Sequence, residues 1–337
     1  NFLMNKAGVI TFDKIVSFLI QIVLGIYAYT VYLFKLFVPY PTSPLYPPPA
    51  SLQAWYWLVA AIAFIVLIGA LAVRRNYRYV TFGMLFFTFN ILLIPFASAV
   101  GDSTFINDRY TYVAYIGLFF IVAMVMQELS EKYPSSGVPI KVVAVILLAV
   151  FSALTIKYIP VWKNSETLWS HVIKKYPHRI PIAYLNRGHF FYNHNQSGRA
   201  LEDFNTAIEI NPHYLQAYMN RGLIYLKVND FENALKDYNS ILDLMRPYDT
   251  SGNVLNPAVS DALGNRGLIY SGMGQYEKAL NDLDLAVKLN PANPVNYLNR
   301  AFVYHKLGRI GEARADVLAA EKMGAAADPV SRELLKR

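Results

Sequence analysis

The 337-residue sequence contains no cysteine, which excludes a disulfide framework and a cysteine-based metal site. Charged residues are also scarce, at 16% of the chain, and Lys and Arg form no long run despite a net charge of +8. The six histidines show no spacing that would place a second metal ligand on the same helix face. These absences argue against a disulfide scaffold, a metal centre and a nucleic-acid-binding surface.

Hydrophobic residues are abundant instead, and they are concentrated in the first half of the chain. They make up 55% of the sequence, and the mean hydropathy is positive, which indicates a membrane protein. Residues 1–159 contain ten Lys or Arg and five Asp or Glu, whereas residues 160–337 contain twenty-one and eighteen. The sequence therefore predicts a transmembrane domain over 1–159. Five segments are long enough to cross a hydrocarbon core of about 30 Å as helices: 15–34, 54–73, 79–100, 110–127 and 140–159.

The positive charges predict how these segments are oriented. Arg74, Arg75 and Arg78 crowd the connection between the second and third segments, so we expect this loop in the cytoplasm. The loops 35–53 and 101–109, and everything after 159, are then expected on the outer side. All four tryptophans fall near this outer interface, where an amphipathic ring is favoured: Trp55, Trp57, Trp162 and Trp169.

The second half contains four copies of one segment. Asn-Arg recurs at 186–187, 220–221, 265–266 and 299–300, with spacings of 34, 45 and 34 residues. Each copy continues with Gly or Ala and later an Ala followed by a second amphipathic stretch. The pattern resembles the tetratricopeptide repeat (TPR), whose helix pairs bury their apolar stripes only by stacking on neighbouring copies. We therefore expect an all-α protein, a polytopic transmembrane bundle of about five spans followed by a TPR α-solenoid.

The resemblance divides the second half further. It implies four repeats over 178–327, with an 11-residue insertion near 246–260 between the second and third copies. Residues 160–177 are expected to form a linker and a capping helix, and residues 328–337 a C-terminal tail. Pro212 and Pro291 are expected to end the second helix of their repeats.

Three sets of positions recur in all four copies. Small residues are expected where the two helices touch: Gly188, Gly222, Gly267 and Ala301 in the first helix, and Ala200, Ala234, Ala279 and Ala313 in the second. Packed Arg–Asp ion pairs with a structural role are expected within or between repeats: Arg187, Arg221, Arg266 and Arg300 with Asp203, Asp237, Asp282 and Asp316.

The third recurring set consists of asparagines: Asn186, Asn220, Asn265 and Asn299. These positions resemble the asparagine ladder on the concave face of some TPR proteins, whose amides hydrogen-bond the backbone of an extended peptide. The insertion is expected to interrupt the spacing of this ladder. Peptide binding and structural capping therefore both stay open for these asparagines.

Four features in a fixed order resemble one family. They are YLFKLFVPYPTSPLYPPP at 32–49, NDRYTYVAYIGLFF at 107–120, VWKNSETLWSHVIKKYP at 161–177, and the repeats. They are similar to the C-terminal half of bacterial relatives of the transmembrane-and-TPR-containing protein O-mannosyltransferases, which are membrane glycosyltransferases of the GT-C type. The resemblance implies sugar transfer from a polyprenyl-phosphate donor to a protein hydroxyl presented by the TPR domain. It also implies a bacterial inner membrane with the TPR domain in the periplasm.

The resemblance also assigns candidate site residues. Family members carry their acidic catalytic residue in an early outer loop, so we expect no catalytic residue after Asn1 and regard the chain as part of a longer protein. Arg109 is implied to hold the donor phosphate, with Asp108 orienting it and Tyr110 or Tyr112 contacting the lipid head or the sugar. Val113-Ala114 departs from the Leu-Pro of many relatives. No metal ligand is assigned, and a divalent-metal requirement stays open.

Without the resemblance, Asp108 and Arg109 indicate only an interfacial ion pair, which contributes below about 1 kcal/mol. A non-enzymatic, membrane-anchored TPR adaptor for envelope proteins then fits the sequence equally. A membrane protein that assembles envelope polysaccharide is a third alternative, because such proteins also combine many spans with TPRs. In each case the lipid bilayer is a partner and nucleic acid is not. A polyprenyl-phosphate sugar and a protein or peptide on the concave face are the further expected partners.

Overall fold

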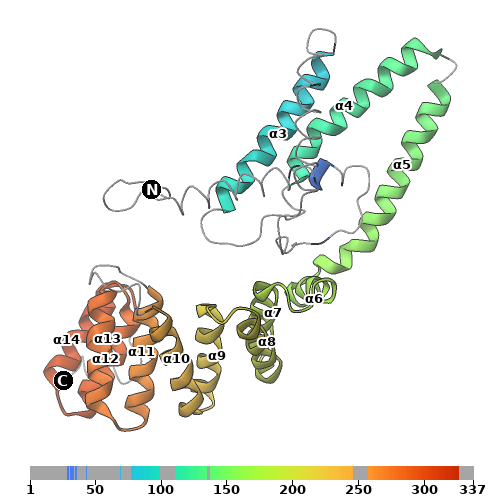
Figure 1. Cartoon of the computed structure of the whole chain (residues 1–337). Helices are drawn as coiled ribbons and strands as arrows, with labels where there is room; N and C mark the ends of the chain where they lie inside the picture. Colours follow the sequence, from blue (N-terminus) through green and yellow to red (C-terminus); the bar gives the residue numbers. More distant parts are fainter. Residues whose placement is uncertain are drawn as a thin grey trace, which may run out of the picture. The chain divides into compact units, whose positions relative to one another are not determined.

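The computed structural model of the protein describes residues 77–98, 111–134, 137–245 and 257–325, together with positions 29, 31–33, 35, 43 and 69. Every regular element among these residues is a helix, as the sequence predicts (Figure 1). The chain divides into two compact units, residues 1–177 and residues 178–337. The boundary falls between the expected linker, 160–177, and the expected repeats that begin at 178.

The first unit contains α3 (Arg78–Ser98), α4 (Thr111–Lys132), α5 (Gly137–Tyr158), a short 3₁₀ helix η4 (Ile159–Trp162) and α6 (Ser165–Lys175). Among the described residues, Val113–Lys132 and Val138–Trp162 are long and apolar enough to cross a membrane. Of the five expected spans, 110–127 and 140–159 correspond to these two helices. Residues 79–100 largely form α3, which is not one of the two, and the expected spans 15–34 and 54–73 lie outside the described residues except for positions 29, 31–33 and 69.

The α5 helix exposes apolar side chains on all of its faces. None of its candidate span is buried in the unit, and Val138 and Leu148 are 72% and 66% exposed. Water penalises such a surface, whereas hydrocarbon does not. The two helices therefore suggest that the protein associates with a membrane.

Two glycines set the packing of α3 against α4. A Cβ atom added to Gly83 would meet the carbonyl oxygen of Gly117 and the side chain of Ile121. A Cβ atom added to Gly117 would in turn meet the carbonyl oxygen of Gly83 and the side chain of Phe86. The two backbones therefore approach more closely than any side chain at these positions would allow.

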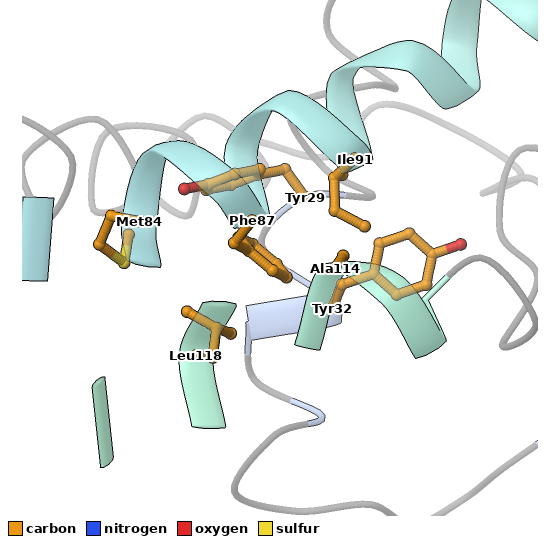
Figure 2. Close-up of a cluster of buried hydrophobic side chains, with 7 residues drawn as sticks. All are labelled: Tyr29, Tyr32, Met84, Phe87, Ile91, Ala114 and Leu118. Atoms are coloured by element: carbon orange, nitrogen blue, oxygen red, sulfur yellow. The ribbon is translucent and has the colours of Figure 1, made fainter. Parts of the chain in front are cut away.

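A buried cluster extends this contact to the segment around residue 30 (Figure 2): Tyr29, Tyr32, Met84, Phe87, Ile91, Ala114 and Leu118. The Tyr29 and Thr88 hydroxyls are hydrogen-bonded at 3.0 Å, and the Tyr115 hydroxyl donates to the Tyr32 carbonyl at 2.8 Å. Polar ends of tyrosines are thus satisfied while their rings fill the cluster. This cluster makes α3 and α4 one packed body.

The predicted helix over 165–177 is confirmed as α6. Asn164 caps it, because its side chain accepts a hydrogen bond from the Thr167 amide at 2.9 Å and its own amide donates one to Thr167 Oγ1 at 3.2 Å. The capping of the repeats by this helix would be a contact between the two units and stays a prediction.

The second unit consists of four helix pairs in chain order (Figure 1). They are α7 (Pro181–Asn193) with α8 (Ser197–Ile210), α9 (Leu215–Lys227) with α10 (Phe231–Met245), α11 (Pro257–Gly272) with α12 (Tyr276–Leu289), and α13 (Pro294–Lys306) with α14 (Ile310–Lys322). The predicted repeats are confirmed. Pro212 and Pro291 follow the ends of α8 and α12, as expected.

The predicted close contacts within each pair are confirmed as well. A Cβ atom on Gly188 would meet Phe204, one on Gly222 would meet Tyr238, and one on Gly267 would meet Leu283. Ala301 takes the place of glycine in the fourth repeat and is buried, as are all four second-helix alanines. Small residues thus let the two helices of a repeat approach at one shared position.

The repeats stack so that their first helices form an inner layer. Each of α7, α9 and α11 touches the first helix of the next repeat, whereas successive second helices make no comparable contact in the described part of the chain. An array whose first helices lie closer together than its second helices must curve toward the first helices. The exposed side of α7, α9, α11 and α13 is therefore the concave face of the unit.

Candidate functional site

The concave face is framed by ion pairs that join the two helices of each repeat. In all four repeats the Arg Nε and Nη2 atoms donate to the two carboxylate oxygens of the Asp sixteen residues later, at 2.6–3.0 Å. The Asp side chains are nearly buried, with exposed fractions of 2–11%. The predicted Arg–Asp pairs are thus confirmed as intra-repeat contacts in the bidentate geometry that guanidinium favours.

Three of these arginines also bind the preceding repeat. The Nη1 atom of Arg221 donates to Asn205 Oδ1 at 2.6 Å, and that of Arg266 donates to Asn239 Oδ1 at 2.7 Å. Arg300 makes the equivalent bond to Asp284 Oδ1 at 2.8 Å. Each of these arginines therefore fixes its own helix pair and the position of the repeat before it.

Sequence reasoning missed the acceptors of these inter-repeat bonds, although a signal was present. Each acceptor lies two residues after a paired Asp, in the segments 203–205, 237–239 and 282–284. The fourth repeat departs from the pattern, because Leu318 follows Asp316 at this spacing. An Asp-x-Asn or Asp-x-Asp segment thus marks a second helix that receives an arginine from the next repeat.

The arginines are held as cations by these contacts. The hydrogen bonds that Arg266 donates to Asp282 are the main reason why its pKa is raised, and those that Arg300 donates to Asp316 likewise raise the pKa of Arg300. Their donors are directed at the second helices. These side chains are consequently not available to a ligand on the concave face.

The insertion between the second and third repeats does not interrupt their stacking. The bond from Arg266 to Asn239 crosses it, with the same geometry as the bond from Arg221 to Asn205. The first helices α9 and α11 also touch across it. The ladder was expected to be interrupted here, and this expectation is wrong, because α9 and α11 touch as the other successive first helices do.

The four ladder asparagines lie half-buried at one equivalent position of the first helices. The Asn265 amide donates to Met219 Sδ on the preceding first helix at 3.5 Å, a weak bond. The side chains of Asn186, Asn220 and Asn299 make no hydrogen bond within the described residues. A carboxamide offers two donor hydrogens and an acceptor oxygen, which match a peptide group.

The ladder borders the exposed surface of the first helices. Residues three and seven positions after an asparagine share its helix face. The residues at the third position are His189, Leu223, Leu268 and Phe302, and those at the seventh are Asn193, Lys227, Gly272 and Lys306. Phe302 is 38% exposed, and His189 and every residue at the seventh position are exposed too. The concave face thus combines amides with apolar side chains, and charge appears only near one edge.

The donor-phosphate residues expected from the sequence are not tested by the structure. Asp108, Arg109 and Tyr110 lie outside the described residues. Tyr112 lies in the first turn of α4, but its side chain is not among those described. Their roles stay predictions.

Comparison with known proteins supports the repeats. Residues 185–249 match a family model described as tetratricopeptide repeat, and residues 262–308 match one described as TPR repeat. No curated protein matches the chain. The chain therefore contains TPR repeats, and none of the comparisons supports the expected relationship to GT-C glycosyltransferases.

Similar solved structures are TPR-type proteins of low sequence identity. MamA (residues 41 to the end) from Desulfovibrio magneticus RS-1 shares 17% identity with a TM-score of 0.40, over 52% of this chain and 94% of that one. PilF from Pseudomonas aeruginosa shares 16% with a TM-score of 0.44, over 55% and 80%. The first TPR of Spaghetti, bound to the HSP90 peptide SRMEEVD, shares 18% with a TM-score of 0.33, over 38% and 93%.

Proposed function

We propose that the chain is a membrane-anchored TPR adaptor that binds a protein partner along its concave face. The observation that carries this proposal is the asparagine ladder on a continuous inner layer of helices. Three of its four amides have no hydrogen-bond partner among the described residues. These half-buried amides reach water, and a bound peptide backbone can take the place of that water as their hydrogen-bond partner. The two apolar helices α4 and α5 supply the membrane anchor.

Site-directed photo-crosslinking in cells tests this proposal. A benzophenone amino acid placed at Phe302 on the concave face should crosslink to a partner, whereas one at Leu285 on α12 should not. The two sites are similarly exposed, at 38% and 43%. Replacing Asn186, Asn220 and Asn299 together by Ala should lower the crosslinked yield at least tenfold, because each lost hydrogen bond costs about 0.5–1.5 kcal/mol.

The matched control for the ladder variant is Asn281→Ala. Asn281 is an exposed asparagine on the second helix α12, so its removal should leave the crosslinked yield unchanged. Equal yields from Phe302 and Leu285, or a yield that the ladder variant does not lower, would refute binding on the concave face.

We further propose that the TPR unit lies on the extracytoplasmic side of a bacterial inner membrane. Support comes from Arg74, Arg75 and Arg78, which predict a cytoplasmic loop, and from the three spans expected after it at 79–100, 110–127 and 140–159. The proposal therefore requires that α3 crosses the membrane together with α4 and α5. Because the chain has no cysteine, Asn281→Cys introduces a single thiol. A maleimide that cannot cross the inner membrane should label it in intact spheroplasts. Labelling only after lysis would place the unit in the cytoplasm.

A second candidate function is that of the acceptor- and donor-binding part of a GT-C protein O-glycosyltransferase. The order of the segments at 32–49, 107–120 and 161–177 before the repeats favours it. In the full-length protein, Arg109→Ala should then reduce transfer from a polyprenyl-phosphate sugar roughly tenfold or more, since hydrogen bonds to charged groups contribute about 1.5–3 kcal/mol. Lys132→Ala serves as a control at the far end of α4. Unchanged transfer and donor affinity in the Arg109 variant would remove its proposed role.

A further inference from the structure

We infer that the concave face takes an extended, uncharged peptide segment of about ten residues, with apolar side chains that contact the first helices. The inference rests on the proposed adaptor function and adds the chemistry and length of the partner. It follows from the charge of the concave face, its exposed apolar side chains and the spacing of its amides.

The middle of the concave face offers no charged group to a partner. All four first-helix arginines are committed to second-helix aspartates. Asp261, the acidic residue of α11, accepts a hydrogen bond from Asn293 at 3.0 Å. A charged side chain bound here would lose its hydration without gaining an opposite charge, which is strongly unfavourable.

The two lysines of this face lie at its edge. Lys227 and Lys306 occupy the last turns of α9 and α13. Their Nζ atoms lie over aromatic rings, 5.5 Å from the centroid of Tyr192 and 5.3 Å from that of Phe302. They do not form a cluster that would favour an acidic peptide along the ladder.

Apolar side chains lie on the same face in the second, third and fourth repeats, and they are most exposed in the fourth. Val295 and Phe302 on α13 are 55% and 38% exposed, and Leu223 and Leu268 continue the row at half-buried positions. Valine and phenylalanine on one exposed helix face cost free energy in water and are stabilised when a partner covers them. The fourth repeat is therefore the expected anchor for an aliphatic or aromatic side chain.

The ladder fixes the length of the segment. Packed helices lie about 8–10 Å apart, and an extended chain advances about 3.3 Å per residue. One asparagine is therefore available for roughly every three peptide residues. Four repeats span about 30 Å, which corresponds to an extended segment of about ten residues.

Fluorescence anisotropy with the full chain in lipid nanodiscs tests this inference, with empty nanodiscs as background. Three labelled decapeptides of equal length are compared: one that alternates Leu or Phe with Ser or Thr, one with Glu at every second apolar position, and one of Ser, Thr and Gly only. The first should bind at least tenfold more tightly than either of the others. Phe302→Ser should weaken its binding roughly tenfold. Leu285→Ser, which changes a similarly exposed leucine on α12, should not.

The outcomes separate the inference from the proposed function. If the acidic or the polar peptide binds best and the Asn186, Asn220 and Asn299 triple variant weakens it, the inferred chemistry is wrong while the adaptor function stands. Equal effects of the Phe302 and Leu285 variants also overturn the apolar anchor. If no peptide binds in a ladder-dependent way, both the inference and peptide binding on the concave face fail.

Discussion

Arg221→Met is expected to destabilise the second repeat by about 3 kcal/mol, because it leaves a buried charge without its partner. The variant keeps an unbranched side chain but leaves the Asp237 carboxylate, which is 2% exposed, without its two hydrogen bonds. It also removes the bond to Asn205 on the first repeat. In hydrogen exchange of the full chain, amides of α9 and α10 should exchange on the order of 100-fold faster.

Two comparisons separate this effect from a general loss of charge. Arg309→Met removes an exposed pair with Glu312, whose side chains are 47% and 50% exposed, and should change exchange little. Adding Asp237→Leu to Arg221→Met should recover most of the lost protection, because no unpaired carboxylate then remains. If the single and the double variants exchanged alike, the unpaired charge would not be the cause.

Gly117→Leu is expected to separate α3 from α4. A side chain at this position runs into the backbone of α3 at Gly83 and into Phe86, and backbone cannot move aside as a flexible side chain can. Overpacking typically costs about 1–3 kcal/mol, and we expect the upper end of that range. The midpoint of unfolding of the detergent-solubilised chain, titrated with SDS and followed by tryptophan fluorescence, measures it.

The matched control is Ile116→Leu at the preceding residue of α4. Ile116 is 59% exposed, so this substitution should leave the midpoint unchanged. A Gly117 variant as stable as this control would mean that the close approach of the two helices does not contribute to the stability of the unit.

The repeats could be predicted from the sequence because their signals are local and periodic. The recurring Asn-Arg pairs, the small residues at the helix contact and the Arg–Asp spacing of sixteen residues each follow from one repeat packing like the next. Gly188 against Phe204 and Arg187 against Asp203 confirm this. The expected glycosyltransferase relationship and the five spans went further than local periodicity. No comparison supports the relationship, and two of the spans, 15–34 and 54–73, lie almost completely outside the described residues.

Contacts between elements were decided only by the tertiary structure. Local periodicity does not encode the bonds that Arg221, Arg266 and Arg300 donate to the preceding repeat. It also does not encode the packing of Gly83 on Gly117 or the continuous stacking across the insertion. The sequence by itself determined the helix pairs and the positions that each pair buries, since these depend on residues within one turn or one repeat. The concave face and its unpartnered amides required the structure, because curvature depends on how closely successive first helices approach one another.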